Sequence, residues 1–188
     1  MENISKLSPR QGRLLVAEPF MRDPFFKRSV VLLAEHNEEG TVGFILNKPM
    51  QLNLDEAVVQ LEGLTSPLFF GGPVQKNSLF FIHTLGEIIE ESKPLLSNLY
   101  WGGNFESLKE LITGGEVKEK YVRFFAGYAG WDVNQLATEM KDNSWIVAKT
   151  DADFVMKTKP EDVWKNALKK LGKDYEIMSN YPEDPSLN

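Results

Sequence analysis

Short apolar runs alternate with polar segments along this chain of 188 residues. The runs are of strand length and are rich in β-branched and aromatic residues, which fit the half-buried surface of a sheet. They cover residues 12–18, 29–35, 41–49, 67–70, 78–84, 121–127 and 144–150. The polar residues 37–40 join two of these runs and end in glycine, a pattern that predicts a β-hairpin. The chain is therefore expected to be rich in strands.

About four other segments carry apolar residues at helical spacing. We expect these helices to begin near Asn53, Asn104, Asp132 and Thr158. The last one has the strongest signals, because Glu161 follows Thr158 at the spacing of a capping box, Pro160 stands in the first turn and Gly172 provides a stop. Residues 104–113, 132–140 and 158–172 are thus predicted to be helical, after a short helix that starts at Asn53.

The order of these elements indicates an α+β fold. Strands follow one another in adjacent pairs more often than they alternate with helices, so a mixed, largely antiparallel sheet is favoured over a doubly wound parallel one. No repeat, low-complexity tract or linker divides the sequence. We therefore expect one domain over residues 1–188.

Composition excludes several classes of function. The chain has no cysteine, and its two histidines, His36 and His83, lie far apart, so we expect no metal site. It contains no phosphate-binding glycine motif of the nucleotide-binding families, so we expect no cofactor. A net charge of −6 makes direct binding of nucleic acid unfavourable. No apolar run approaches the roughly 20 residues of a membrane span and no secretion signal is evident, which favours a cytoplasmic protein.

The segment GYAGW, residues 127–131, stands between a predicted strand and a predicted helix. A carboxylate at the helix start, Asp132, would occupy the backbone donors that a phosphate needs, so we reject a phosphate cradle. Two interpretations remain. The glycines form a tight corner with Tyr128 and Trp131 packed over it, or the two rings are the walls of a shallow pocket in which Asp132 and Glu139 are polar anchors.

Other polar positions are candidates for contact with a ligand. His36, with Glu35 or Glu39 beside it, has the residue types of a general acid or base, or is an exposed loop histidine. Two roles are open for Asn47: its side chain orients a substrate, or it satisfies the hydrogen bonds of nearby backbone groups. Arg22–Asp23 and Lys27–Arg28 offer charges within residues 19–28, which we call the strap and expect to be irregular, with its phenylalanines packed inward. His83 is expected to be a sheet residue with one hydrogen bond.

Several segments together resemble the YqgE/AlgH family of small bacterial proteins, in the right order along nearly the whole chain. They are "GRLLVAEPFMRDPFFKRSVVLL", "HNEEGTVGFILNKP", "FFGGPV", "FFAGYAGWDVNQLATEM" and "YPEDPSLN". The resemblance implies a single α+β domain whose bifurcated sheet is curled into a partial barrel. It also implies the label of a transcriptional regulator, although no reaction is settled for the family.

The resemblance places characteristic positions on the chain. They fall on Pro19, Asp23, Pro24, Phe26, His36, Gly40, Gly43, Asn47, Pro49, Gly71, Gly72, Pro73, Gly127, Tyr128, Gly130, Trp131, Gln135 and Leu136. The sequence departs from the family pattern at residues 132–134, where relatives often carry a proline and a small residue before the Gln-Leu pair.

Three functional hypotheses follow. The leading one is a cytoplasmic regulatory or adaptor module that binds an unknown protein or small-molecule ligand, with an indirect role in transcription. The second is a hydrolase-like enzyme that uses His36 and Asn47, and the third is a direct DNA-binding regulator, which the acidic composition opposes. The candidate binding residues are Arg22, Asp23, Arg28, His36, Asn47, Tyr128, Trp131 and Gln135.

Overall fold

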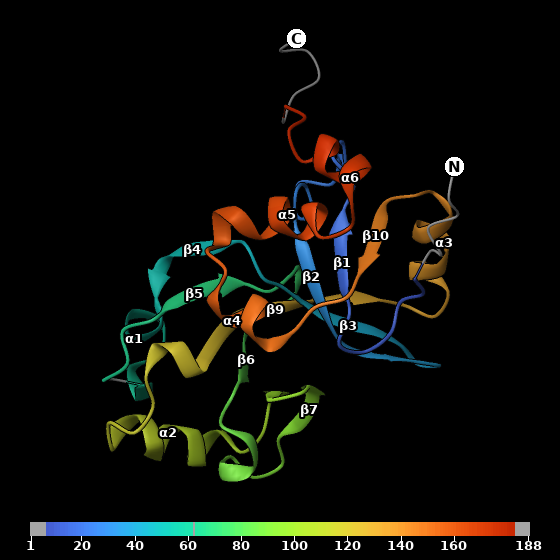
Figure 1. Ribbon diagram of the computed structural model, residues 1–188. Coiled ribbons are helices and arrows are strands. Elements are labelled where there is room, and N and C mark those ends of the chain that lie inside the picture. The colour runs from blue at the N-terminus through green and yellow to red at the C-terminus, as the bar shows by residue number, and fades with distance from the viewer. Residues whose placement is uncertain (1–6, 62, 183–188) are drawn as a thin grey trace.

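A computed structural model describes residues 7–61 and 63–182 of the chain (Figure 1). Its strands are β1 Leu14–Ala17, β2 Val30–Asn37, β3 Gly40–Ile45, β4 Pro49–Asn53, β5 Pro67–Phe70, β6 Val74–His83, β7 Lys93–Leu96, β8 Leu99–Trp101, β9 Val122–Trp131 and β10 Trp145–Ala148. Its helices are α1 Leu54–Ala57, α2 Phe105–Thr113, α3 Gln135–Lys141, α4 Ala152–Lys157, α5 Pro160–Lys169 and α6 Lys173–Met178. Residues 183–188, which end the segment YPEDPSLN, lie outside the described residues.

The predicted α+β class and the largely antiparallel sheet are confirmed. The strands follow the order β10-β1-β2-β3-β9-β6-β8-β7, with β4 attached through β5. Within the described ranges the single parallel pair is β5 with β9. The hairpin expected at residues 37–40 joins β2 to β3, where Asn37 pairs with Gly40. None of the helices in these ranges is long and apolar enough to cross a membrane.

Strand β1 shows why an uninterrupted apolar run forms this sheet. Leu14 and Val16 belong to a buried cluster under α4 and α5, whereas Leu15 and Ala17 belong to a second cluster on the opposite face. Because successive residues of a strand point to opposite faces, a strand covered on both sides needs apolar residues at every position. The covering helix α5 is fixed to β1 by Trp164, whose Nε1 donates to the Ala17 carbonyl at 2.8 Å.

Strand β9 is the centre of the sheet and divides it into two branches (Figure 1). One edge pairs with β6. The other edge pairs with β5 over residues 124–126 and with β3 over residues 129–131. This branching agrees with the bifurcated sheet that the family resemblance implied.

The GYAGW segment is not a corner, because β9 runs through it as far as Trp131. Its first glycine serves a different purpose. To pass from β5 to β6 the chain crosses β9 at Gly71–Gly72, and a Cβ atom on Gly71 would lie 2.2 Å from the Gly127 carbonyl oxygen. A Cβ on Gly127 would likewise lie 2.6 Å from the Gly72 oxygen. The glycines therefore let two backbone segments touch, which is the other common role of glycine inside a strand.

The described residues form six α-helices where about four were expected. The additional helices, α4 and α6, are short and flank α5. Asn104 caps α2 as predicted, because its side chain accepts a hydrogen bond from the Ser107 N–H at 3.1 Å. The capping box predicted at Thr158 is wrong: Thr158 ends α4, and α5 begins after Lys159 without a side-chain cap.

The third helix also begins later than expected. Asn134 adopts a left-handed conformation with φ of 65° and precedes the first helical residue, Gln135, so Asp132 lies outside the helix. Asp132 still contacts the first residue of the helix, because its N–H donates a hydrogen bond to the Gln135 Oε1 at 3.0 Å.

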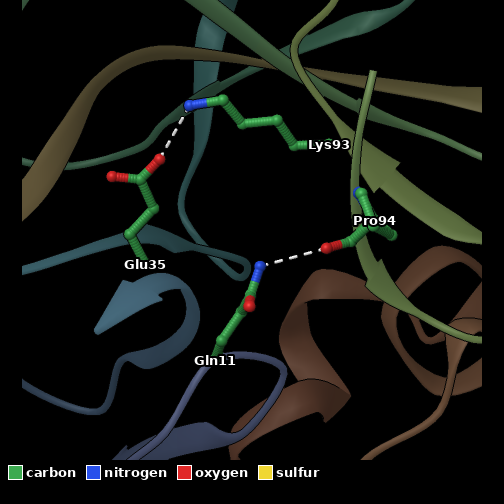
Figure 2. Close-up of polar contacts among 4 residues, drawn as sticks. All are labelled: Gln11, Glu35, Lys93 and Pro94. Atoms are coloured by element: carbon green, nitrogen blue, oxygen red, sulfur yellow. Dashed lines mark hydrogen bonds and ion pairs between the residues drawn. The ribbon is translucent and has the colours of Figure 1, made fainter. Parts of the chain in front are cut away.

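The sheet curls without closing into a barrel. Its edge strand β7 approaches β2 and the segment before β1, and Figure 2 shows the two polar contacts there. The Gln11 side chain donates to the Pro94 carbonyl at 3.0 Å, and Lys93 pairs with Glu35 at 2.9 Å. These are side-chain contacts, and β7 forms a backbone ladder with β8 alone among the described strands. The result is an open, partly barrel-like sheet.

Candidate functional site

Two clefts flank the C-terminal end of β9. Gly130, Trp131 and Gln135 line both of them, so the end of β9, where Trp131 is packed to 4% exposure, forms a ridge between the two hollows. The first, which we call the hairpin cleft, has a volume of about 450 Å³, and the second, the strap cleft, about 510 Å³. The ridge exists because β9 ends here and α3 begins four residues later.

The hairpin cleft lies beside the β2–β3 turn. Its lining is Glu35, Asn37, Glu39, Gly40, Thr41, Val42, Val74, Tyr128, Gly130, Trp131, Asp132 and Gln135. Pairing of Thr41 with Trp131 and of Val42 with Gly130 brings the hairpin to the end of β9. The Tyr128 ring packs edge-on against Phe80, with ring centroids 5.5 Å apart, and so forms a firm wall.

The strap cleft lies on the other side of the ridge. Its lining is Glu18, Phe20, Met21, Arg22, Asp23, Phe26, Pro73, Gly130, Trp131, Gln135, Glu139, Ser144 and Trp145. The strap holds its shape through Asp23, whose Oδ1 accepts hydrogen bonds from the Phe25 and Phe26 N–H groups at 2.8 and 3.3 Å. This is the local Asx-type turn that a short carboxylate side chain favours.

The Glu139 carboxylate organises the ridge. Its Oε2 accepts hydrogen bonds from the indole N–H groups of Trp131 and Trp145 at 2.9 and 2.7 Å, and its Oε1 accepts one from Gln135 Nε2 at 3.0 Å. Hydrogen bonds to an ionised acceptor are shorter and stronger than neutral ones. The network thus fixes both indole rings and ties α3 to β9 and β10.

Phe26 completes an aromatic cluster with these two indoles. Its ring stacks on Trp131 at 5.9 Å between centroids and meets Trp145 edge-on at 5.4 Å. The expectation that the strap turns its rings inward holds for Phe26 but is wrong for Phe20 and Phe25, which are 43% and 40% exposed. The strap therefore presents apolar surface to solvent next to the cleft.

The structure brings together five of the eight candidate binding residues. Tyr128, Trp131 and Gln135 line the hairpin cleft, and Arg22 and Asp23 line the strap cleft together with Trp131 and Gln135. Each interpretation of GYAGW keeps one feature: Trp131 is packed to 4% exposure, and Tyr128 and Trp131 also line the hairpin cleft. Both residues belong to a strand. Of the proposed anchors, Asp132 lines the hairpin cleft and Glu139 the strap cleft.

Two other candidates, Arg28 and Asn47, lie elsewhere. The Asn47 amide accepts from the Val30 N–H at 2.9 Å and donates to the Arg28 carbonyl at 2.8 Å, so it satisfies backbone groups between the strap and β2. The Arg28 guanidinium lies over the Trp164 ring at 4.6 Å and donates to the Tyr181 carbonyl. Asn47 therefore ties the strap to β2, and Arg28 connects the strap to α5 and the segment after α6.

His36 and Asn47 are not placed to act as a catalytic pair. His36 is exposed at the hairpin end of β2, where its Nδ1 lies 2.7 Å from the Thr41 hydroxyl. Asn47 is bonded to Val30 at the other end of the same strand. Six residues of extended chain separate the two ends by roughly 20 Å. Within the described ranges, no group of three or more histidine and carboxylate side chains is placed to hold a metal ion.

Sequence reasoning missed the part that Trp145 plays. It belongs to a predicted strand, and its N–H partner, Glu139, comes from a predicted helix six residues earlier. The antiparallel pairing of β10 with β1, in which Trp145 faces Ala17, sets that ring beside the strap. The sequence signal was a lone tryptophan at the start of a short apolar run, which does not specify the neighbouring strand.

Charge is distributed unevenly around the ridge. The hairpin cleft contains Glu35, Glu39 and Asp132 and no cationic side chain in its lining. The strap cleft contains three carboxylates, those of Glu18, Asp23 and Glu139, and one guanidinium, that of Arg22. The two linings therefore hold six carboxylates and one cation, and one of the six, Glu35, pairs with Lys93 outside the lining. Clefts lined by one sign of charge focus the electrostatic field and attract the opposite charge.

Comparison with known proteins agrees with this architecture. The AlgH-like family model matches residues 14–176. A UPF0301 protein of Bacteroides thetaiotaomicron is 41% identical over 96% of this chain and 92% of its own length. A UPF0301 protein of Cytophaga hutchinsonii is 42% identical over 95% of this chain and 98% of its own length.

Solved structures share the fold as well. The crystal structure of a Corynebacterium diphtheriae protein superposes with a TM-score of 0.80 at 24% identity, covering 95% of each chain. The solution structure of the AlgH protein from Pseudomonas aeruginosa gives a TM-score of 0.73 at 30% identity, over 95% of this chain and 98% of that one. From the match over most of its length and these relatives, this chain belongs to the AlgH-like family.

Proposed function

We propose that this protein is a binding module that holds a basic, partly apolar segment of a partner protein across the end of β9. One observation carries the proposal: the end of β9 separates two clefts whose linings hold six carboxylates and one guanidinium. Electrostatic complementarity of this kind raises association rates and selects partners of opposite charge.

The apolar parts of the clefts support a peptide ligand over a simple cation. Val42, Val74 and Tyr128 contribute to the hairpin cleft, and Met21 and Phe26 to the strap cleft. Lysine and arginine side chains have apolar stems that pack on such surfaces while the charged end reaches carboxylates or water. The ring edges of Trp131 are held by Glu139, so the ridge is rigid before a ligand arrives. A preorganised surface loses less entropy on binding.

A regulatory or adaptor role follows from partner binding, and an indirect effect on transcription would act through that partner in the cytoplasm. Direct binding of DNA at this surface is opposed by the carboxylates, because duplex DNA needs cations along its phosphates. The hydrolase hypothesis loses support, since His36 and Asn47 lie at opposite ends of β2.

The test uses two fluorescent peptides, one composed of lysine and leucine and the other with glutamate in place of each lysine. We expect the lysine peptide to bind, with an affinity that falls as salt concentration rises, and the glutamate peptide to remain free. Reversal of two exposed cleft charges, Glu39→Lys with Asp132→Lys, should weaken binding by about tenfold, which corresponds to about 1.4 kcal/mol. Fluorescence anisotropy measures both affinities.

A matched control carries the same change of net charge at exposed sites outside both clefts, Glu87→Lys with Glu110→Lys. This variant should bind the lysine peptide within about twofold of the wild type, because surface charges farther away than a Debye length are screened. Equal weakening in both double variants would show a general charge effect and would overturn the proposed site. Binding of both peptides alike would overturn the preference for a basic partner.

A further inference from the structure

Strand β9 carries a buried cation at its opposite end. Arg123 is 8% exposed, and its Nη1 and Nη2 donate to the carbonyls of Leu46 and Met156, each at 3.4 Å. The guanidinium also lies over the Phe69 ring at 4.7 Å. In residues 7–61 and 63–182, no carboxylate forms an ion pair with it. Long hydrogen bonds to neutral carbonyls are weak compensation for a buried charge.

Desolvation disfavours the charged form of this group. Burial lowers the pKa of Arg123 to about 10, and the charge of Glu119 offsets part of that shift. Glu119 is exposed and too far away for an ion pair, so it compensates the guanidinium only at a distance. A buried charge without a direct counter-ion is costly, and charged groups perturbed by desolvation in a cleft are concentrated at functional sites.

Arg123 lines a hollow of about 360 Å³ between β9, β5 and the α4–α5 junction. Three further cations, Lys120, Lys157 and Lys159, line the same hollow, and Glu119 is its single carboxylate. The lining therefore carries four positive charges and one negative charge, and among the described residues Lys157 is the one of the four that pairs with a carboxylate outside the lining, that of Asp153 at 2.8 Å. The net charge of the chain, by contrast, is −6. The hydroxyls of Ser66 and Thr158 belong to the lining too.

The start of α5 lies at the rim and adds the positive end of a ten-residue helix. Its N-cap, Lys159, makes no side-chain capping bond, but Pro160 has no N–H group and the Asp162 N–H donates to the Lys159 carbonyl at 2.9 Å. The first turn carries two acidic residues, Glu161 and Asp162, and neither belongs to this lining; Glu161 lines a different hollow, beside Arg28. The helix start is therefore a minor contribution beside the cationic side chains of the lining.

We propose that this hollow binds the phosphoryl group of a small molecule, with the Arg123 guanidinium as its buried anchor. Guanidinium groups match the geometry of phosphate oxygens, and lysine ammonium groups add charge around them. The hollow is too small for a nucleic-acid duplex but has room for a phosphorylated metabolite. The site is independent of the acidic clefts, because it lies at the start of β9 and they lie at its end.

Isothermal titration calorimetry with inorganic phosphate as the probe tests the site, with potassium chloride at equal ionic strength as the blank. We expect saturable binding of phosphate, with a dissociation constant of about 1 mM or lower. Lys159→Ala should raise that constant by roughly threefold, and Glu119→Gln should lower it by roughly threefold, because each changes one charge at the rim. Both positions are exposed, so the fold should tolerate the changes.

The matched control is Lys169→Ala, which removes the same charge from the other end of α5. Its phosphate affinity should equal that of the wild type. Arg123→Met should abolish phosphate binding if the variant folds. If it does not fold, the dissociation constants of the Lys159 and Glu119 variants test the proposal in its place. No saturable heat with the wild type, or equal affinities in the Lys159, Glu119 and Lys169 variants, would overturn the proposal. Neither result would bear on the peptide-binding clefts.

Discussion

His83 illustrates how hydrogen bonds can select one neutral tautomer of a buried side chain. It is fully buried in β6, where its Nδ1 accepts from the Leu85 N–H at 3.3 Å and its Nε2 donates to the Gly102 carbonyl at 3.1 Å. The Ser92 hydroxyl lies 3.0 Å from Nε2 as well. The sequence predicted a strand histidine with one hydrogen bond, and the structure adds two more contacts. A proton added at Nδ1 would face another N–H group.

We therefore expect stability to fall with acidification. Burial lowers the pKa of His83 below its ordinary value of 6.5, and the hydrogen bond to Gly102 opposes this in part. The unfolded chain thus binds more protons between the two pKa values, so the free energy of unfolding decreases as pH falls through about 6.5 and levels off below the folded pKa. Urea unfolding between about pH 7 and about pH 5 measures the slope.

The two histidines provide a comparison for that slope. His83→Gln should remove most of it, whereas His36→Gln, at an exposed position, should leave it unchanged. A slope that survives in His83→Gln would show that other groups cause the acid sensitivity.

At the scale of elements, the crossing of the β5–β6 connection over β9 depends on glycine. A methyl group on Gly71 would meet the backbone at 2.2 Å, and a backbone atom cannot move aside as the end of a flexible side chain can. The crossing gives β9 two different partners on one edge, β5 next to the start of the strand that carries Arg123 and β3 of the hairpin next to its end.

Gly71→Ala should consequently lower the free energy of unfolding by about 3 kcal/mol, as overpacking against a rigid backbone does. Gly115→Ala is the control. Gly115 has a φ of +73° but open space around its Cβ position. Its alanine variant should therefore lose only the free energy needed to hold alanine in a left-handed conformation, about 1 kcal/mol, without any clash. Chemical denaturation followed by tryptophan fluorescence compares the two. A Gly71 variant as stable as the Gly115 variant would show that the crossing adapts easily.

At the scale of the whole molecule, the far edge of the curled sheet is held mainly by apolar contacts. Leu95 of β7 is buried in the same cluster as Leu14 of β1 and Leu32 of β2. The polar contacts of Figure 2 lie nearer the surface, where the Lys93 and Glu35 side chains are 60% and 35% exposed. Exposed ion pairs stabilise little because water and salt screen them.

Leu95→Ala should destabilise the protein by about 3 kcal/mol through the lost burial and the cavity left behind. Glu35→Gln should change stability by less than about 1 kcal/mol. Thermal or urea unfolding of the two variants distinguishes the contributions. If Glu35→Gln proved as harmful as Leu95→Ala, the polar contacts and not the apolar cluster would hold this edge.

Local patterns in the sequence were sufficient for the fold class and for much of the element list. The β2–β3 hairpin follows from the polar turn at residues 37–40, and the start of α2 follows from the cap at Asn104, because both signals lie within a few residues of the structure that they specify. Strands β7 and β8 gave no such signal. They are short and interrupted by polar residues, and their place depends on pairing with β6.

The sequence by itself thus determined the α+β class, the family resemblance and the acidic character, and it nominated Tyr128, Trp131 and Gln135 as candidates. Only the tertiary structure decided that GYAGW is a strand crossed by a second glycine segment, that His36 and Asn47 are apart, and that Arg123 is buried without a carboxylate partner. The physical reason is the range of the interactions. Periodicity and caps act over a few neighbouring residues, whereas a cleft or a buried charge is made by residues that only long-range strand pairing brings together.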